Sequence, residues 1–191
     1  SILRRFRERY PAVKLELREA MTAQQIELLN AQQADLGFVI PPLQNADGLT
    51  SEVVARYRLV AAIPEGHPLA RHAQIKLSDL AHDPWILFSA RQGPGLHRII
   101  LDACARAGFI PNIGQEAPQM ETIANLVAGG MGVALVSRAL ATGGRKGVAF
   151  CELTGPGAPV EFELAVAYAQ STPILDAFIA ATRDQTTLTT S

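Results

Sequence analysis

The chain has 191 residues, 48% hydrophobic and 18% charged, with a formal net charge of −1, a composition typical of a soluble globular protein. The near-zero charge argues against a surface that binds nucleic acid by itself, because such binding depends on Lys and Arg neutralising phosphates. No apolar run approaches the ~18 residues of a membrane span and no secretory segment opens the chain, so we expect a cytoplasmic protein without membrane contact.

The first half of the chain alternates helical and strand-like patterns. Phe6 and Tyr10 have helical spacing, and Pro11 ends that helix. The next segments predict a strand, a helix capped by Thr22, a buried strand and a long β-rich stretch: AVKLELRE (12–19), TAQQIELLNAQQ (22–33), DLGFVI (35–40) and SEVVARYRLVAAIP (51–64). Strand–helix–strand with an apolar second strand favours a parallel sheet covered by helices.

A second alternation of strands and helices follows. It comprises WILFS (85–89), LHRIILDACARAG (96–108), IPNIGQEA (110–117), PQMETIANLVAGG (118–130) and GVALVS (132–137). Gly108 marks the end of the first helix. Two further strands, GVAFCEL (147–153) and EFELAVAYA (161–169), precede a last helix with Thr172 as its cap and Pro173 at its first position. The doubled pattern predicts two lobes.

Two glycine clusters have different meanings. Gly129, Gly130 and Gly132 follow a helix and precede a strand, whereas a dinucleotide loop requires the opposite order. They are therefore expected to end the helix and form a tight turn. The stretch FSARQGPGLHR (88–98) does run strand, loop, helix, but it lacks the residues of a phosphate loop. A small anion such as a carboxylate fits its backbone amides; a purely structural turn is an equal alternative.

Catalytic signals are few. The four histidines, His67, His72, His82 and His97, pair with no obvious nucleophile, and Ser89 lacks the G-x-S-x-G setting. Cys104 and Cys151 have neither metal-ligand spacing nor a second pair, so no disulfide framework is expected. We predict a protein that is not an enzyme and needs no metal or cofactor.

Five segments in order resemble a known family. They are LRRFRERYPAVKLELRE, LLNAQQADLGFVI, LVAAIPEGHPLA, LSDLAHDPWILF and LVAGGMGVALVSRAL. Together they resemble the effector-binding domain of LysR-type transcriptional regulators, from about Leu3 to Ala181. GQEAPQMETI and DACARAGF are most similar to the branch that responds to intermediates of aromatic degradation.

The resemblance implies an α/β fold of two Rossmann-like lobes joined by two crossing strands, like type II periplasmic binding proteins, with the effector held between the lobes. It assigns residues 1–62 and 167–191 to the first lobe and 63–166 to the second. The crossing strands are expected near Arg58–Pro64 and Glu163–Tyr168. The family's winged helix-turn-helix and the first strand of the first lobe are expected before Ser1, so DNA binding is expected only through that N-terminal domain.

Two other classes of protein are alternatives to a transcriptional regulator. A periplasmic solute-binding protein has the same fold. An enzyme on this fold, such as a prephenate dehydratase or a porphobilinogen-polymerising synthase, needs a catalytic Thr motif or a cofactor-bearing Cys, and neither is recognisable around Thr122 or Cys151.

The expected partners are a small effector, most simply a carboxylate, and further copies of the chain in a homodimer or tetramer. The predicted effector site comprises Ile40, Pro41, Ile63, Ser89, Arg91, Gln92, Gly93, Pro118 and Gln119. Self-association is implied through the first helix and a helix of the second lobe. That helix carries Met120, Ile123, Leu126 and Val127, more apolar residues than one buried stripe needs.

Overall fold

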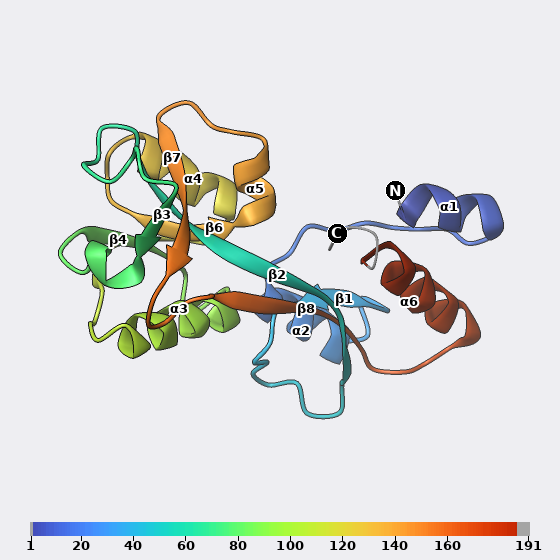
Figure 1. Ribbon diagram of the computed structural model, residues 1–191. Coiled ribbons are helices and arrows are strands. Elements are labelled where there is room, and N and C mark those ends of the chain that lie inside the picture. The colour runs from blue at the N-terminus through green and yellow to red at the C-terminus, as the bar shows by residue number, and fades with distance from the viewer. Residues whose placement is uncertain (1, 187–191) are drawn as a thin grey trace. The chain divides into compact units, whose positions relative to one another are not determined.

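The computed structural model describes residues 2–186, with the side chains of residues 3–183 (Figure 1). The chain divides into two compact units. Unit 1 comprises Ser1–Arg56 and Glu163–Ser191, and unit 2 comprises Tyr57–Phe162. Both boundaries fall within long strands, whereas the sequence-based boundaries were placed after residues 62 and 166. Among the described helices, none is long and apolar enough to cross a membrane.

The described part of unit 1 contains three helices and a small sheet. Its elements are α1 (Ile2–Arg9), α2 (Thr22–Asn30), β1 (Gly37–Val39), the first part of β2 (Thr50–Pro64), most of β8 (Glu161–Tyr168) and α6 (Pro173–Thr186). β1 pairs antiparallel with β8, with Phe38 opposite Val166, and β8 lies between β1 and β2. The parallel sheet predicted for this part is therefore wrong, because the neighbour of β1 comes from the other end of the chain.

Two helices of unit 1 pack on each other through aromatic rings. α1 and α6 lie side by side, and the Phe6 and Phe178 rings meet edge-on at 4.9 Å (Figure 1). Phe6 is only 3% exposed. The cap predicted for α6 is confirmed, since Leu175 N donates to Thr172 Oγ1 at 3.3 Å and Pro173 is the first helical residue.

The strand predicted over residues 12–19 does not form. None of the described strands pairs with this segment, which is irregular, and Leu17 is 69% exposed. Its alternating pattern meets the local requirement for a strand, but a strand also needs a hydrogen-bonded neighbour. Thr22 is likewise the first residue of α2 rather than its cap, and its hydroxyl accepts a hydrogen bond from Ile40 N at 3.3 Å.

Unit 2 is the larger α/β body. Its further elements are β3 (Gln74–Lys76), a short 3-10 helix (Leu77–Leu80), β4 (Pro84–Phe88), α3 (Pro94–Arg106), β5 (Asn112–Ala117), α4 (Met120–Ala128), β6 (Ala134–Ser137), α5 (Arg138–Thr142) and β7 (Val148–Thr154). β2 pairs antiparallel with β6 and β7, and β3 pairs parallel with β7. β4 and β5 are parallel and α3 connects them, which confirms the strand–helix–strand reading of this region.

The glycines after α4 form a turn. Gly130 has φ +74°, the left-handed conformation that commonly ends a helix. Gly132 has φ +150°, and a Cβ on it would lie 2.3 Å from Pro84 O. The prediction of a helix end and tight turn is therefore confirmed, and the backbone of this turn passes directly over the start of β4.

Candidate functional site

The carboxyl ends of β4 and β5 bring two predicted donor segments together within unit 2. The strands are parallel with Phe88 opposite Ala117, and Ser89 N donates to Ala117 O at 3.2 Å. The loop 89–93 leads into α3, while Pro118 and Gln119 lead into α4. Both helices therefore begin at the same edge of the strand pair. Edges of this kind are common ligand sites in α/β folds.

Some amides of the loop are already used. Gly93 N donates to Ser89 O at 2.9 Å, and Ala90 N donates to Glu116 Oε2 at 3.3 Å. Within the described residues, the amides of Arg91 and Gln92 have no such partner. The first turn of α3 adds amides that have no acceptor inside the helix, as does the first turn of α4. These groups can bind an anion.

Side chains add charge at this edge. Arg91 is exposed and forms no ion pair with a described residue, and Gln92, Pro118 and Gln119 are exposed as well. Arg145, from the segment before β7, reaches the first turn of α4 and forms an ion pair with Glu121. The sequence prediction did not include Arg145, because only the fold brings it to α4.

Two further side chains hold the end of β4. His97, in the first turns of α3, has its Nδ1 2.7 Å from Phe88 O. Glu116, the penultimate residue of β5, accepts the hydrogen bond from Ala90 N. The sequence prediction assigned neither residue to the site. The polar residues Gln115 and Glu116, immediately before the end of β5, were a signal that could have indicated Glu116.

The three predicted apolar residues belong to other segments than the β4–β5 edge. Ile40 and Pro41 follow β1 in unit 1 and are half-buried. Ile63 lies in unit 2, opposite Ala149 in the β2–β7 pair, and is 0% exposed. In this structure the Ile63 side chain is therefore part of the core of unit 2.

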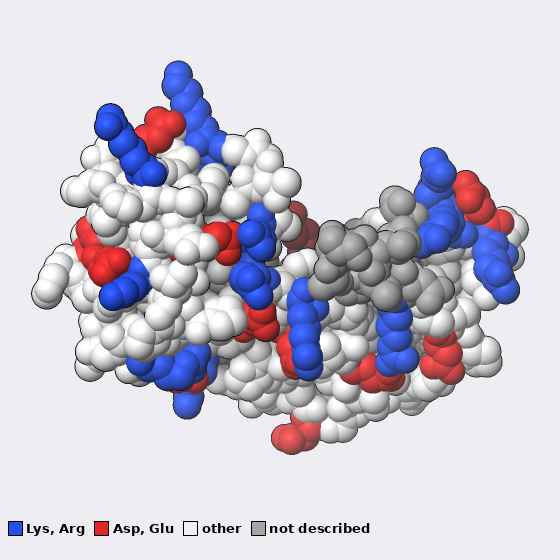
Figure 2. Space-filling view, viewed as in Figure 1, with Lys and Arg blue, Asp and Glu red and all other residues white. Residues whose placement is uncertain are grey.

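Nucleophilic and metal chemistry have little basis in the described residues. Burial raises the pKa of the Cys104 thiol to about 12 and also raises the pKa of Cys151, which disfavours the reactive thiolate. No group of three or more described His, Cys, Asp and Glu residues could hold a metal ion. Figure 2 shows Lys and Arg interspersed with Asp and Glu over one face of the molecule rather than gathered into a single-sign field.

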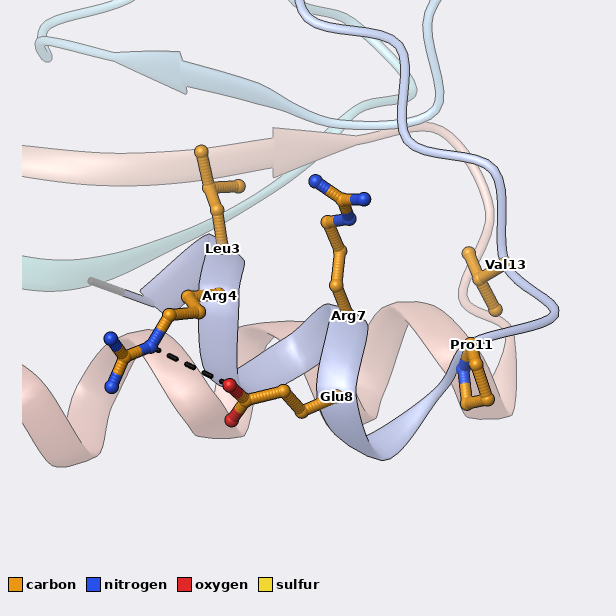
Figure 3. Close-up of a pocket in the computed structure, with 6 residues that line it drawn as sticks. All are labelled: Leu3, Arg4, Arg7, Glu8, Pro11 and Val13. Carbon is orange, nitrogen blue, oxygen red and sulfur yellow. Dashed lines mark ion pairs between the residues drawn. The ribbon is translucent and has the colours of Figure 1, made fainter.

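Two cavities share no residue with the β4–β5 edge. One, of about 520 Å³, lies beside α1 and is lined by Leu3, Arg4, Arg7, Glu8, Pro11 and Val13. Figure 3 shows Leu3 and Arg7 leaving α1 on the same side, while Arg4 reaches the Glu8 carboxylate at 3.5 Å. The other, of about 200 Å³, lies between α5 and β7.

The chain is similar to proteins of one family. The model of the LysR substrate binding domain matches residues 1–187. A relative, the HTH-type transcriptional regulator AlsR of Bacillus subtilis (strain 168), is 36% identical over 135 residues, which is 71% of this chain and 44% of the relative. The chain thus spans about half the length of the curated relatives it matches.

Solved structures show the same fold. The effector binding domain of QuiR in complex with shikimate has a TM-score of 0.84 at 20% identity and covers 98% of this chain and 89% of that one. The BenM effector binding domain with its effector benzoate has a TM-score of 0.81 at 18% identity, with coverages of 99% and 86%. At these identities the likeness establishes the fold class: a mixed α/β architecture of two lobes, as in type II periplasmic binding proteins.

Proposed function

Because the chain belongs to the LysR substrate binding domain family, we propose that it is the effector-sensing part of a bacterial transcriptional regulator. The relatives that it matches are named as regulators rather than as periplasmic solute-binding proteins. In this proposal DNA is bound by a winged helix-turn-helix domain outside this chain, and the whole protein works in the cytoplasm without catalysing a reaction. Activation and repression of transcription by the effector are both compatible with this role.

We propose a small carboxylate as the effector. The parallel ends of β4 and β5 carry this proposal, because they place the loop 89–93 and the starts of α3 and α4 at one edge. Helix starts favour anions through their free amides and their partial positive charge. Arg91 adds a positive charge there, whereas Arg145 is paired with Glu121 and Glu116 adds a negative charge at the loop. The two neighbours described above are named with carboxylic acids, shikimate and benzoate.

We predict that Gly93→Val weakens effector binding at least tenfold. A Cβ on Gly93 would lie 3.8 Å from Ser89 O, an ordinary contact, so the backbone leaves room for a Cβ, and we expect the valine side chain to obstruct an incoming ligand. The effector is first found by thermal shift with aromatic and dicarboxylic acids, where a ligand at 100 times its Kd adds about 2.7 kcal/mol of stability. Titration calorimetry then compares the variants.

Gly143→Val is the matched control for this measurement. It lies at the end of α5 in the same unit, and its Cβ would meet Leu140 O at 3.9 Å. Equal affinity of the wild type, Gly93→Val and Gln119→Ala would refute the proposed site.

We propose that the chain forms a homodimer, which can itself pair into a tetramer. The surface proposed for unit 2 differs from α4, the helix that the sequence predicts. Of the four apolar residues predicted for α4, Ile123 and Val127 are completely buried against the strands of unit 2, whereas Met120 and Leu126 are half-buried. Exposed apolar side chains instead flank the start of β5, where Ile110 is 89% exposed and Ile113 is also exposed. Such residues are typical of partner surfaces. α1 remains the candidate surface of unit 1.

We predict that Ile110→Asp shifts the monomer–dimer equilibrium at least tenfold toward monomer in analytical ultracentrifugation. A charge at the centre of an apolar contact would be buried without a partner. Met131→Asp is the control, since Met131 is exposed at the end of α4 and lies outside the proposed surface. If Met131→Asp dissociates the dimer and Ile110→Asp does not, the interface lies at α4 instead.

A further inference from the structure

Two histidines of unit 2 contact the backbone of the same residue. Leu69 N donates to His67 Nδ1 at 3.2 Å, and His72 Nδ1 lies 3.3 Å from Leu69 O. A ring nitrogen that accepts from an amide carries no proton, whereas a ring nitrogen hydrogen-bonded to a carbonyl must carry one. The Nδ1 atoms of His67 and His72 are therefore in opposite protonation states.

The second ring nitrogen of His67 fixes its tautomer. His67 Nε2 lies 3.1 Å from Asp83 Oδ1, and the two side chains are 14% and 25% exposed. An ionised carboxylate can only accept, so Nε2 carries the proton of the neutral ring and Nδ1 keeps its lone pair. Neutral His67 thus joins two segments of unit 2: the turn 65–71, which follows β2, and the segment before β4.

The surroundings of His67 contain one charged partner and one thiol. Within the described residues, Asp83 is the ionisable group that is hydrogen-bonded to the ring. The other titratable side chains of the two joined segments are exposed: Glu65, Arg71, His72 and His82. From β7, the Cys151 thiol donates to Leu69 O at 3.9 Å and is 1% exposed, while Glu152 pairs with Arg138. The turn 65–71 therefore helps to cover Cys151.

We propose that His67 is a pH-dependent clasp that holds the turn 65–71 in place. When the ring gains a second proton, Nδ1 loses its lone pair and can no longer accept from Leu69 N, while Nε2 still donates to Asp83. The turn is then released at Leu69, and the Cys151 thiol becomes accessible. The clasp is closed at neutral pH and opens as the pH falls through the range of about 8 to 5, in which imidazole side chains change charge. It acts independently of the effector proposed above.

The first test is amide hydrogen exchange of the wild-type chain, followed by NMR at about pH 7.5 and about pH 5.5. Each measured rate is divided by the intrinsic exchange rate at the same pH. We expect the protection of the Leu69 amide to be about fivefold lower at the acidic pH, because one hydrogen bond is lost. Ile86 N donates to Val133 O at 2.8 Å in the core, so its amide is the internal control and keeps its protection.

The second test compares two histidine variants. His67→Asn places an acceptor near the position of Nδ1 and cannot gain a proton, so the Leu69 amide is expected to be equally protected at both pH values. His72→Asn is the matched control. Because His72 Nδ1 donates to Leu69 O in both charge states of the ring, this variant keeps the fivefold change.

The third test measures the accessibility of Cys151 with 4,4′-dithiodipyridine, a thiol reagent that also reacts at acidic pH. It uses chains with Cys104→Ala, so that Cys151 is the only thiol. At about pH 5.5 we expect labelling to be about fivefold faster with His67 than with His67→Asn, and at about pH 7.5 the two rates are expected to be equal. Comparison at one pH removes the pH dependence of the reagent itself.

Three results would overturn the clasp. In the first, the Leu69 amide is equally protected at both pH values. In the second, the change persists in His67→Asn, because another group then titrates. In the third, Leu69 and Ile86 lose protection together, since the whole of unit 2 then opens. Equal labelling rates at acidic pH would overturn the exposure of Cys151. If melting curves show that His67→Asn has lost its fold, the wild-type exchange and His72→Asn still decide, and none of these results bears on the effector site.

Discussion

Trp85→Ala is expected to lower the free energy of unfolding by about 3–5 kcal/mol, the cost typical of removing a large aromatic side chain from a core. Trp85 lies in β4 with 0% exposure, and its indole Nε1 donates to Leu80 O at 3.0 Å. Its ring packs 5.9 Å from that of Phe109. Alanine leaves a cavity in the core of unit 2 and removes one of the two hydrogen bonds to Leu80 O, which also accepts from Asp83 N at 3.2 Å. Urea denaturation followed by circular dichroism measures the loss of stability. Tryptophan fluorescence cannot follow this variant, because Trp85 is the only tryptophan of the chain.

Trp85→Phe divides this loss into its parts. Phenylalanine keeps most of the aromatic packing and removes the hydrogen bond to Leu80 O, so a smaller loss of about 1–3 kcal/mol is expected. If both variants were as stable as the wild type, β4 would not be the core strand of unit 2, and the register of the β4–β5 edge would have to be revised.

Gly132→Ala is expected to destabilise unit 2 by about 3 kcal/mol, the sum of backbone strain and steric overlap. Its φ of +150° is unfavourable for alanine, and the new Cβ would lie 2.3 Å from Pro84 O. That oxygen accepts from Val133 N at 2.8 Å, and Ile86 N donates to Val133 O at 2.8 Å. The overlap can be relieved only by moving the backbone that joins β4 to this turn.

Gly130→Ala provides the control for this prediction. Gly130 also has a positive φ, +74°, but nothing lies within 4 Å of its Cβ position. Only the conformational cost remains, about 1 kcal/mol. Equal losses in thermal or urea unfolding for the two variants would mean that the turn does not approach β4 as closely as the structure has it.

Much of the fold followed from local sequence signals. α3 ends before Gly108, whose φ is +89°, as predicted, although it begins at Pro94, two residues before the predicted start. Such signals act within a few residues, so they can be read without knowing the rest of the fold. The strand predicted over residues 12–19 shows the limit of this approach. Its alternation is a local property, whereas pairing depends on a neighbour that the pattern does not specify.

The candidate site, like the fold, was predicted only in part from the sequence. The order strand, loop, helix around residues 88–98 predicted where α3 follows β4, and the starts of α3 and α4 lie at the same edge of the strand pair, as expected. The roles of His97, Glu116 and Arg145 were not predicted, because each depends on a contact with a residue from another element. Ile63 shows a second limit, since its apolar character fits a ligand wall as well as it fits the core in which the structure places it.

Most element types, several helix ends, the family and the doubled α/β pattern could be predicted from the sequence, because these depend on residue order and short-range sterics. The tertiary structure alone decided which strands pair, which apolar side chains are buried and which polar groups meet at the β4–β5 edge. The antiparallel pairing of β1 with β8 joins residues about 130 positions apart, as Gly37 and Ala167 illustrate. Burial and pairing are shared properties of distant segments, so they are fixed only when the whole chain packs and every buried surface finds its partner.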